Sequence, residues 1–406
     1  MSDPNRTADV LVLGGGVIGC ASALRLAQAG LSVTLIERGA CGRESSWAGA
    51  GILDEGSLAR RDPLALLRRA SVARWPDFAA EVQERSGCDV GYVRCGALDL
   101  IHDDNQHAAA LRESGLAIEA PRIDDQPRAE MLTAAQVAVR EPLVTRELRG
   151  ALLKRSMAQV RNPRLMRGLR IACARVGVRM VEHTPVGALW VEPATLADAD
   201  AHAFHGRPAV RVCGVETAGG RYAAPHTVLA AGAWSSQIAA ELNAVMPVYP
   251  VRGQIALLEL GAPAFRHILY SGRTYLVCRD DGRILTGSSE EHDSGFDRRN
   301  TTYAVESILR AAQRVVPALR DATLLQTWAG LRPGTPDRLP WLGPVPGLAG
   351  LFAATGHFRS GLTLAPITAA LVTQWITGTA TELDCGPFRP GRALRRVEGE
   401  GEDGLW

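Results

Sequence analysis

The apolar and polar positions at the start of the chain follow two patterns, one typical of buried strands and one typical of a helix. Residues 10–13 and 32–36 are short, mostly apolar runs, as expected of strands buried in a parallel sheet. Residues 17–29 carry apolar side chains at helical spacing, and Gly30 follows as a helix-ending residue. The chain therefore opens with a predicted strand, helix and second strand.

The rest of the chain contains further segments of both kinds, separated by turn residues. A helix is predicted to begin at Pro63, with Asp62 as its cap, and to continue towards residue 87. Residues 103–137 are polar and mixed, so no element is predicted there. The other predicted elements are a strand at 92–101, a helix and two strands at 162–192, a strand and a serine-capped helix at 226–242, strands through 247–290, a helix at 302–313, and a strand, glycine turn and helix at 350–378.

This order of elements predicts an α/β fold, α+β overall, in which one domain is assembled from separated pieces. Strand–helix units stand at both ends of the chain, and β-rich segments lie between them, which indicates an inserted domain built on an antiparallel sheet. The first domain is expected to comprise residues 1–87, 148–243 and 325–385, the inserted domain residues 88–147 and 244–324, and a loosely ordered tail residues 386–406.

Composition and charge exclude several functional classes. The formal net charge of +2, from 45 basic and 43 acidic residues, gives no reason to expect nucleic acid or a stable membrane association. Eight isolated cysteines, none in a CxxC pair, are typical of reduced thiols and predict a cytoplasmic protein. His202 and His205 are spaced like metal ligands, but a third ligand is missing, so no metal site is expected.

The glycine turn after the first strand has the spacing of a dinucleotide site. Gly14, Gly16 and Gly19 form GxGxxG between a strand and a helix, which permits a tight turn, close approach of a pyrophosphate and close helix packing. Glu37 ends the second strand, where an acid can accept the hydroxyl groups of an adenosine ribose. The motif alone fits NAD and FAD equally well.

Two other stretches suggest contacts with a ligand. In GRESSWAGAGIL (42–53), small residues would let the backbone pass close to a flat ring, and Ser45 and Ser46 could bond phosphate oxygens. In TWAGLRPGTPD (327–337), Arg332 stands in an apolar segment with no acidic neighbour before Asp337. A partner for this cation that is not part of the protein, such as a substrate carboxylate, would explain the arrangement.

These stretches, together with VLGGGVIG, EHTPV, VLAAGAWS and ATGHFRSGLTLAP, resemble the D-amino-acid oxidase superfamily of flavoproteins, and most closely its glycine oxidases of thiamine biosynthesis. The resemblance spans nearly the whole chain. It implies a Rossmann-like FAD-binding domain of glutathione-reductase type and an inserted substrate domain. FAD is expected to be bound without a covalent link, because no cysteine lies in 327–337, where the sarcosine-oxidase branch attaches the flavin.

The resemblance also assigns roles to individual residues. Arg332 would bind the substrate carboxylate, Tyr275 would donate its hydroxyl to the same group, and Arg359 would lie near them. No residue is expected to act as a catalytic acid or base. The residues expected to contact FAD are Gly14, Gly16, Val17, Ile18, Gly19, Glu37, Arg38, Ser45, Ser46, Ala50, Gly51, Ile52, Val186, His357, Phe358, Arg359, Ser360, Gly361, Leu362 and Thr363.

The implied reaction is hydride transfer from a neutral small amino acid, glycine first, to the flavin. Molecular oxygen would reoxidise the flavin, and glyoxylate, ammonia and hydrogen peroxide would result, with a link to thiazole formation. The family also suggests a homotetramer. Sarcosine or small D-amino acids as substrates, a quinone as acceptor, and a flavin-holding subunit of a larger assembly remain open. Arg273 and Glu290 stand where a glycine oxidase of this family has histidine and methionine, so they bear on substrate preference.

Overall fold

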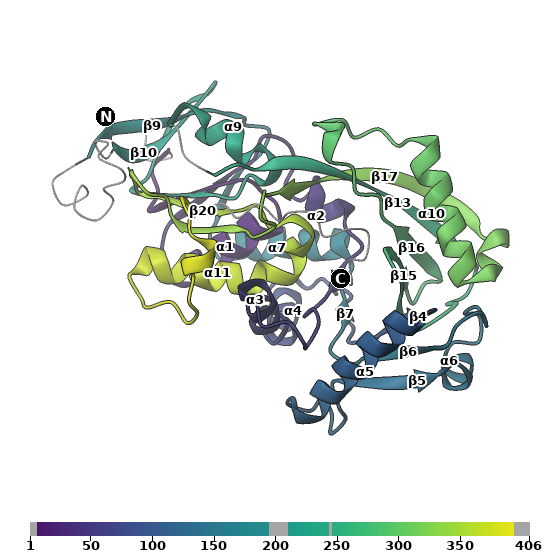
Figure 1. The fold of residues 1–406 in the computed structure, drawn as a ribbon. Helices are drawn as coiled ribbons and strands as arrows, with labels where there is room; N and C mark the ends of the chain where they lie inside the picture. Colours follow the sequence, from purple (N-terminus) through teal and green to yellow (C-terminus); the bar gives the residue numbers. More distant parts are fainter. Residues whose placement is uncertain (1–5, 195–209, 243–245, 394–406) are drawn as a thin grey trace.

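The computed structural model describes residues 6–194, 210–242 and 246–393. The predicted loop histidines, His202 and His205, lie outside these residues. Figure 1 shows two lobes, one around α1, α7 and α11 and one around the strands β13 to β17, with long strands running from one to the other.

A six-stranded sheet forms the centre of the first lobe. Its order is β18-β20-β12-β1-β2-β8, and every neighbouring pair is parallel except β18 and β20. The glycine turn after β1 therefore lies at the carboxyl edge of the sheet, between the ends of β2 and β12. The strands are β1 (Val10–Leu13), β2 (Val33–Ile36), β8 (Arg179–Val181), β12 (His226–Leu229), β18 (Trp341–Pro344) and β20 (Leu351–Thr355).

Both faces of this sheet are covered, and β1 shows why its residues are all apolar. Val10 and Val12 belong to a core shared with α4 (Trp75–Ser86) and three further helices, whereas Leu11 and Leu13 belong to a core shared with a second, four-stranded sheet. Successive residues of a strand point to opposite faces, so each face receives two of them. The three further helices are α1 (Val17–Gln28), α7 (Asn162–Arg175) and α11 (Gly361–Thr377), and the strands are β9 (Val186–Pro193), β10 (Val210–Thr217), β11 (Gly220–Ala223) and β19 (Leu348–Ala349).

An eight-stranded sheet forms the second lobe, in the order β17-β13-β16-β15-β14-β4-β6-β5. All pairs are antiparallel except β14 with β4. Helix α10 (Thr302–Val315) covers the face that points away from α1 and α2 (Figure 1). The strands are β4 (Ala97–Ile101), β5 (Ala129–Thr133), β6 (Gly150–Lys154), β13 (Tyr249–Glu259), β14 (Ile268–Ser271), β15 (Thr274–Cys278), β16 (Arg283–Gly287) and β17 (Thr323–Gly334).

The predicted fold class is confirmed, but two of the predicted boundaries do not match the sheets. Strand β6 was expected in the first domain, yet it pairs with β4 and β5 in the second sheet. The predicted domain boundary between residues 324 and 325 falls inside β17. This element is one strand, which pairs with β13 from Tyr249↔Gly334 to Glu259↔Thr323. Pairing between strands distant in sequence decides both cases, and the local pattern carries no information about it.

Three local predictions are also corrected. The helix expected through residue 87 is two helices, α3 (Pro63–Val72) and α4 (Trp75–Ser86), because Pro76 favours a new helix start and cannot donate within a continuous one. The predicted cap at Asp62 is present. No serine caps α9 (Ser235–Ala239), whose first residue instead bonds the Thr355 hydroxyl. The mixed stretch 103–137 forms α5 (Asp104–Glu119), β5 and α6 (Ala134–Arg140).

Short elements join the lobes near the glycine turn. Helix α2 (Ser45–Ala48) and the two-stranded sheet of β3 (Ile52–Leu53) and β7 (Ala158–Gln159) lie between the two large sheets. The 3₁₀ turn η6 (Phe358–Ser360) precedes α11. All eight cysteines are free thiols, in keeping with the sequence prediction. Within the described residues, none of the helices has the length and apolar character needed to cross a membrane.

Residues 386–393, expected to begin a loose tail, pack against the first lobe instead. Phe388 is buried, and Arg392 donates to both carboxylate oxygens of Asp337 at 2.7 and 2.8 Å. The Arg392 guanidinium also lies 3.5 Å from the ring centre of Trp341. The two charged side chains are only 10 and 8% exposed, so this ion pair anchors the end of the described chain.

Replacing Arg392 with alanine should lower the free energy of unfolding by about 3 kcal/mol, because it leaves the buried Asp337 carboxylate without its partner. Arg310→Ala is the matched control. It breaks an exposed ion pair with Glu306 one helical turn away and should cost at most about 0.5 kcal/mol. Chemical denaturation of the two variants measures the difference. Equal losses would show that residues 386–393 contribute no more than a surface contact.

Candidate active site

The glycine turn between β1 and α1 is tight, as its sequence predicts. Gly14 has a φ of +108° and donates its N–H to the Ile36 carbonyl at 2.8 Å. A Cβ on Gly14 would lie 2.5 Å from the Ala230 carbonyl oxygen, and a Cβ on Gly19 would overlap the carbonyl oxygen of Gly14. Both positions therefore require glycine for packing, whatever ligand the turn holds.

Gly16 differs, because the space beside it is open. A Cβ there would meet only the Ser46 hydroxyl, at 3.1 Å, and Gly16 lines a cavity of about 460 Å³, here called the first cavity. The first-turn amides of α1 have no partners within the helix, and one of them, at Val17, donates to the Ser46 hydroxyl at 2.9 Å. A bare backbone and a helix N-terminus facing a cavity suit a phosphate group.

Glu37 braces the turn from the end of β2. Its carboxylate accepts the N–H of Gly15 at 2.7 Å and the N–H of Gly39 at 2.8 Å. Oxygen lone pairs remain for a ribose hydroxyl, as the sequence predicts, but the carboxylate also has a structural task. The neighbouring Arg38 donates to Glu44 at 2.7 Å and lies 3.5 Å from the ring centre of Trp234.

The first cavity brings together most of the residues expected to bind FAD, although they come from four separate parts of the chain. Its walls also include residues that were not foreseen, among them Trp234, Gln237 and the stretch 230–232. The expected residues that line it are Gly14, Gly16, Val17, Ile18, Glu37, Arg38, Ser45, Ser46, Val186, His357, Phe358, Arg359, Gly361 and Leu362.

The start of α11 closes one wall of the cavity. His357 is buried, and burial lowers its pKa to about 3, so the imidazole is neutral beside the Thr368 hydroxyl. Phe358 has a φ of +49°, a conformation that a bulky side chain adopts only when its surroundings impose it. The Thr363 carbonyl accepts from Ser71 at 2.6 Å and from Trp75 at 3.0 Å. These contacts fix the first turn of the helix.

The loop that follows α2 is held between the two lobes. Ser45 donates its hydroxyl hydrogen to the Leu331 carbonyl. This hydroxyl was expected from the sequence to bond a phosphate oxygen, but its proton is already used within the protein. Trp328 donates to the Ala48 carbonyl at 3.0 Å. Buried Arg279 donates to the Ala50 carbonyl at 2.8 Å and to Gln159 at 2.5 Å. Arg279 was missed in the sequence, since nothing near it in the chain marks it.

A smaller cavity of about 190 Å³, here called the second cavity, adjoins the first between β13, β15, β17 and α2. Ser45, Gly49, Arg332, Arg359 and Leu362 line both cavities, so a ligand could extend from one into the other. Of the expected residues, the second cavity is lined by Tyr275, Ala50, Gly51, Ile52, Ser360 and Thr363, besides Ser45, Arg332, Arg359 and Leu362. Gly19 lines neither cavity and acts through packing.

Arg332 lies at the junction of the two cavities. Its guanidinium donates to the Ser289 carbonyl at 3.0 Å and to the Ser288 hydroxyl at 2.6 Å. Among the described residues, no carboxylate forms an ion pair with it, and Asp337 is bound by Arg392. Burial, and then the positive charge of Arg359, lower the pKa of Arg332 to about 10. Such a site favours an added anion.

The surroundings of Arg332 hold its guanidinium in one place. A Cβ on Gly253, in the neighbouring strand β13, would overlap the guanidinium atoms, so the arginine lies flat against bare backbone. Tyr275 is 8% exposed, and burial raises its pKa, which keeps the hydroxyl protonated and able to donate. Arg359 donates to Glu290 at 3.2 Å. Burial would raise the pKa of Glu290, but Arg359, His292 and Arg332 hold it below its usual range.

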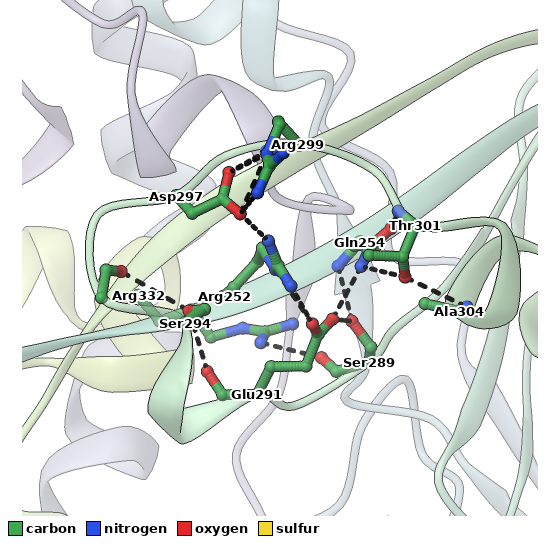
Figure 2. Close-up of polar contacts among 11 residues, drawn as sticks. Arg252, Gln254, Ser289, Glu291, Ser294, Asp297, Arg299, Thr301, Ala304 and Arg332 are labelled. Carbon is green, nitrogen blue, oxygen red and sulfur yellow. Dashed lines mark hydrogen bonds and ion pairs between the residues drawn. The ribbon is translucent and has the colours of Figure 1, made fainter.

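A polar network behind Arg332 fixes the segment that carries Ser289 (Figure 2). Glu291 accepts from Arg252 at 2.6 and 2.9 Å, from Gln254 at 2.8 Å and from the Ser289 hydroxyl at 2.5 Å. Arg252 donates in addition to Asp297 at 2.9 Å. All of the Glu291 acceptor positions are thus used inside the protein, so Glu291 positions the segment and does not offer a site for substrate.

Comparison with known proteins finds relatives that match nearly the whole chain. The glycine oxidase of Pseudomonas aeruginosa is 37% identical over 387 residues, which cover 95% of this chain and 99% of that protein. The bifunctional protein ThiO/ThiG of Synechocystis is 31% identical over 396 residues, which cover 96% of this chain and 54% of that protein. The crystal structure of glycine oxidase from Geobacillus kaustophilus matches with a TM-score of 0.85 and 30% identity, covering 96% of this chain and 100% of that one.

A family model described as FAD dependent oxidoreductase matches residues 9–375, a range that contains the glycine turn and every residue that lines the two cavities. The chain belongs to this family of FAD-dependent oxidoreductases.

Proposed function

We propose that the chain catalyses the FAD-dependent oxidation of a small amino acid, with glycine as the first candidate substrate. The observation that carries the proposal is the buried guanidinium of Arg332 at the junction of the two cavities, with no carboxylate partner among the described residues. Relatives named glycine oxidase, aligned over nearly their whole length, support glycine as the substrate. Oxygen as the acceptor is proposed on the same ground.

The residues around the first cavity fit FAD. The open backbone at Gly16 and the α1 N-terminus would hold its phosphates, Glu37 its ribose, and Val186 would lie on the adenosine side. The start of α11 would meet the flavin, where the cavities join. Bound FAD supplies the acceptor for the hydride that leaves the substrate. We propose non-covalent binding, because residues 327–337 contain no cysteine.

The side chains of the second cavity would orient the substrate. Arg332 would hold its carboxylate in a forked contact, and the protonated Tyr275 would donate to the same group. The carboxylate is then fixed, and the α-carbon can present its hydrogen in one direction. Among the residues that line this cavity, we assign none as a proton acceptor, so the amine would have to react in its neutral form. The balanced reaction converts glycine, oxygen and water into glyoxylate, ammonia and hydrogen peroxide.

The metabolic role that we propose is the supply of an oxidised glycine for thiazole formation in thiamine biosynthesis. The bifunctional ThiO/ThiG relative supports the link, and this chain aligns with 54% of that relative's length. Sarcosine and small D-amino acids are the second candidates, because Arg332 and Tyr275 recognise a carboxylate that all of these substrates share. A homotetramer is a further proposal, which the resemblance alone suggests.

Gly16→Val should leave the protein folded while weakening FAD binding at least about tenfold, since the side chain would enter space that a phosphate needs. Bound flavin is measured by absorbance after gel filtration. The control is Gly14→Val, which should instead unfold or aggregate, because its Cβ would overlap packed backbone. Acid precipitation of the wild-type protein should release free FAD. Full flavin occupancy in folded Gly16→Val would show that the phosphates bind elsewhere.

Arg332→Ala should reduce kcat/KM for glycine between about thirty-fold and several thousand-fold, which corresponds to a loss of roughly 2–5 kcal/mol. Arg332→Lys should recover only part, because an ammonium group cannot form the fork. Steady-state peroxide assays measure both variants. FAD content should stay constant, and methylamine, which lacks the carboxylate, should be a poor substrate that the mutation hardly affects. Equal loss on glycine and methylamine would assign Arg332 to the flavin or the fold.

Gly253→Ala tests the position of the arginine without removing its charge. The added methyl group would displace the Arg332 guanidinium, so KM for glycine should rise at least about tenfold while FAD binding is unchanged. The matched control is Gly115→Ala, an exposed position in α5 without a positive φ and with free space around its Cβ. An unchanged KM in folded Gly253→Ala would mean that the guanidinium need not lie against this strand.

A further inference from the structure

The second cavity contains more positive charge than a substrate with one carboxylate requires. Four arginines line it: Arg68 from α3, Arg273 from the turn between β14 and β15, Arg332 from β17 and Arg359 from η6. Asp54 is the one acidic side chain among the described residues that line it. Guanidinium groups gathered in a small cavity repel each other, and an anion between them relieves the repulsion.

Two of these arginines already have partners or a proposed role. Arg359 forms an ion pair with Glu290 at 3.2 Å, and Arg332 is proposed to bind the substrate carboxylate. Ser288 lies between them and accepts from both, at 3.5 and 2.6 Å. A monocarboxylic amino acid and Glu290 would therefore complete the charge balance at this end of the cavity.

The other two arginines would remain without a counter-charge. Arg68 is partly buried and donates to the Ser360 hydroxyl at 2.6 and 3.1 Å, but it forms no ion pair with a described residue. Arg273 is exposed at the rim and has no hydrogen bond or ion pair to the described part of the chain. Asp54 accepts from the Gly56 N–H at 2.7 Å and pairs with neither arginine.

The second cavity would also receive part of the flavin, because Ala50, Gly51, Ile52 and Thr363, which are expected to contact FAD, line it. The substrate would lie in the rest of the cavity, beside the arginines. The unpaired cations there determine which kind of extension of the substrate is favourable.

We propose that Arg68 and Arg273 form a second anion subsite, and that the preferred substrates are small α-amino acids carrying a second carboxylate. The inference rests on the proposed function and narrows its substrate class. The second carboxylate could be attached to the α-carbon, as in D-aspartate, or to the nitrogen, as in iminodiacetate. With oxygen and water, the first gives oxaloacetate, ammonia and hydrogen peroxide. The second gives glyoxylate, glycine and hydrogen peroxide.

The test compares each acid with its uncharged amide of the same shape, using the FAD-loaded protein. D-Aspartate is compared with D-asparagine, and iminodiacetate with its monoamide, by kcat/KM in a peroxide assay. At least one acid should exceed its amide by about tenfold or more. The pair that shows the preference identifies the point of attachment. In addition, succinate should bind more tightly than succinamate when binding is followed by the change in flavin absorbance.

Arg273→Met should reduce the acid-to-amide ratio about threefold, the size expected for an exposed charge pair. Adding Arg68→Met should bring the ratio close to one. Arg320→Met, which changes an exposed arginine outside both cavities, is the control and should leave the ratio as it is. Rescue by Arg273→Lys would distinguish charge from shape.

The outcomes separate the two proposals. If glycine is oxidised but both acid-to-amide ratios are near one, and succinate binds no better than succinamate, the second subsite is wrong and the proposed function stands. If succinate binds selectively through Arg68 and Arg273 but no amino acid is oxidised, the subsite stands and the proposed function is wrong.

Discussion

The rest of the site depends on one constraint, a buried guanidinium that forms no ion pair with any carboxylate in the described part of the chain. Removing Arg332 from water is costly, and neutral groups, the Ser289 carbonyl and the Ser288 hydroxyl, offset only part of that cost. A carboxylate supplied by a substrate would complete the compensation. The protein therefore keeps the site in a state that a suitable anion stabilises, and the same desolvation makes the resulting contact strong.

The Arg332 guanidinium can hold a substrate in one orientation only if it cannot move to a position of lower energy, such as one in water. Bare backbone at Gly253 on one side and the network around Glu291 on the other leave the side chain little freedom. The charged groups of this network are paired with each other within the protein, so they hold the segment in position and do not attract a ligand. The second cavity differs from this network in having arginines whose charges are not matched locally.

The sequence could predict the features that depend on residues close together in the chain. The first strand, helix and strand, the glycine turn and the cap at Asp62 all follow from local pattern, and their positions agree with the structure. Arg332 was expected, from its apolar surroundings and from family resemblance, to bind a substrate carboxylate; the structure places it where the two cavities meet, and its role stays a prediction.

Other features depend on partners distant in the chain and could not be read in this way. Strand β6 has the same apolar pattern as a strand of the first lobe, and only its pairing places it in the second sheet. Arg279 serves the Ala50 carbonyl from more than two hundred residues away, and the hydroxyl of Ser45 is used by β17. The break between α3 and α4 could have been predicted from Pro76. The helical periodicity on both sides of this proline instead indicated one continuous helix.

The residues that line the first cavity come from distant parts of the chain, which affects when the cavity can form. The glycine turn is complete within the first twenty residues, yet the wall formed by His357 and the start of α11 comes from the last eighth of the sequence. The intervening strands must pair across these long separations before the wall can close, which makes folding slow relative to local helix formation. A growing polypeptide on the ribosome thus has the phosphate-binding turn long before it has a cavity. The first cavity can therefore enclose a ligand only after residues 357–362 have been synthesised and have packed against the glycine turn.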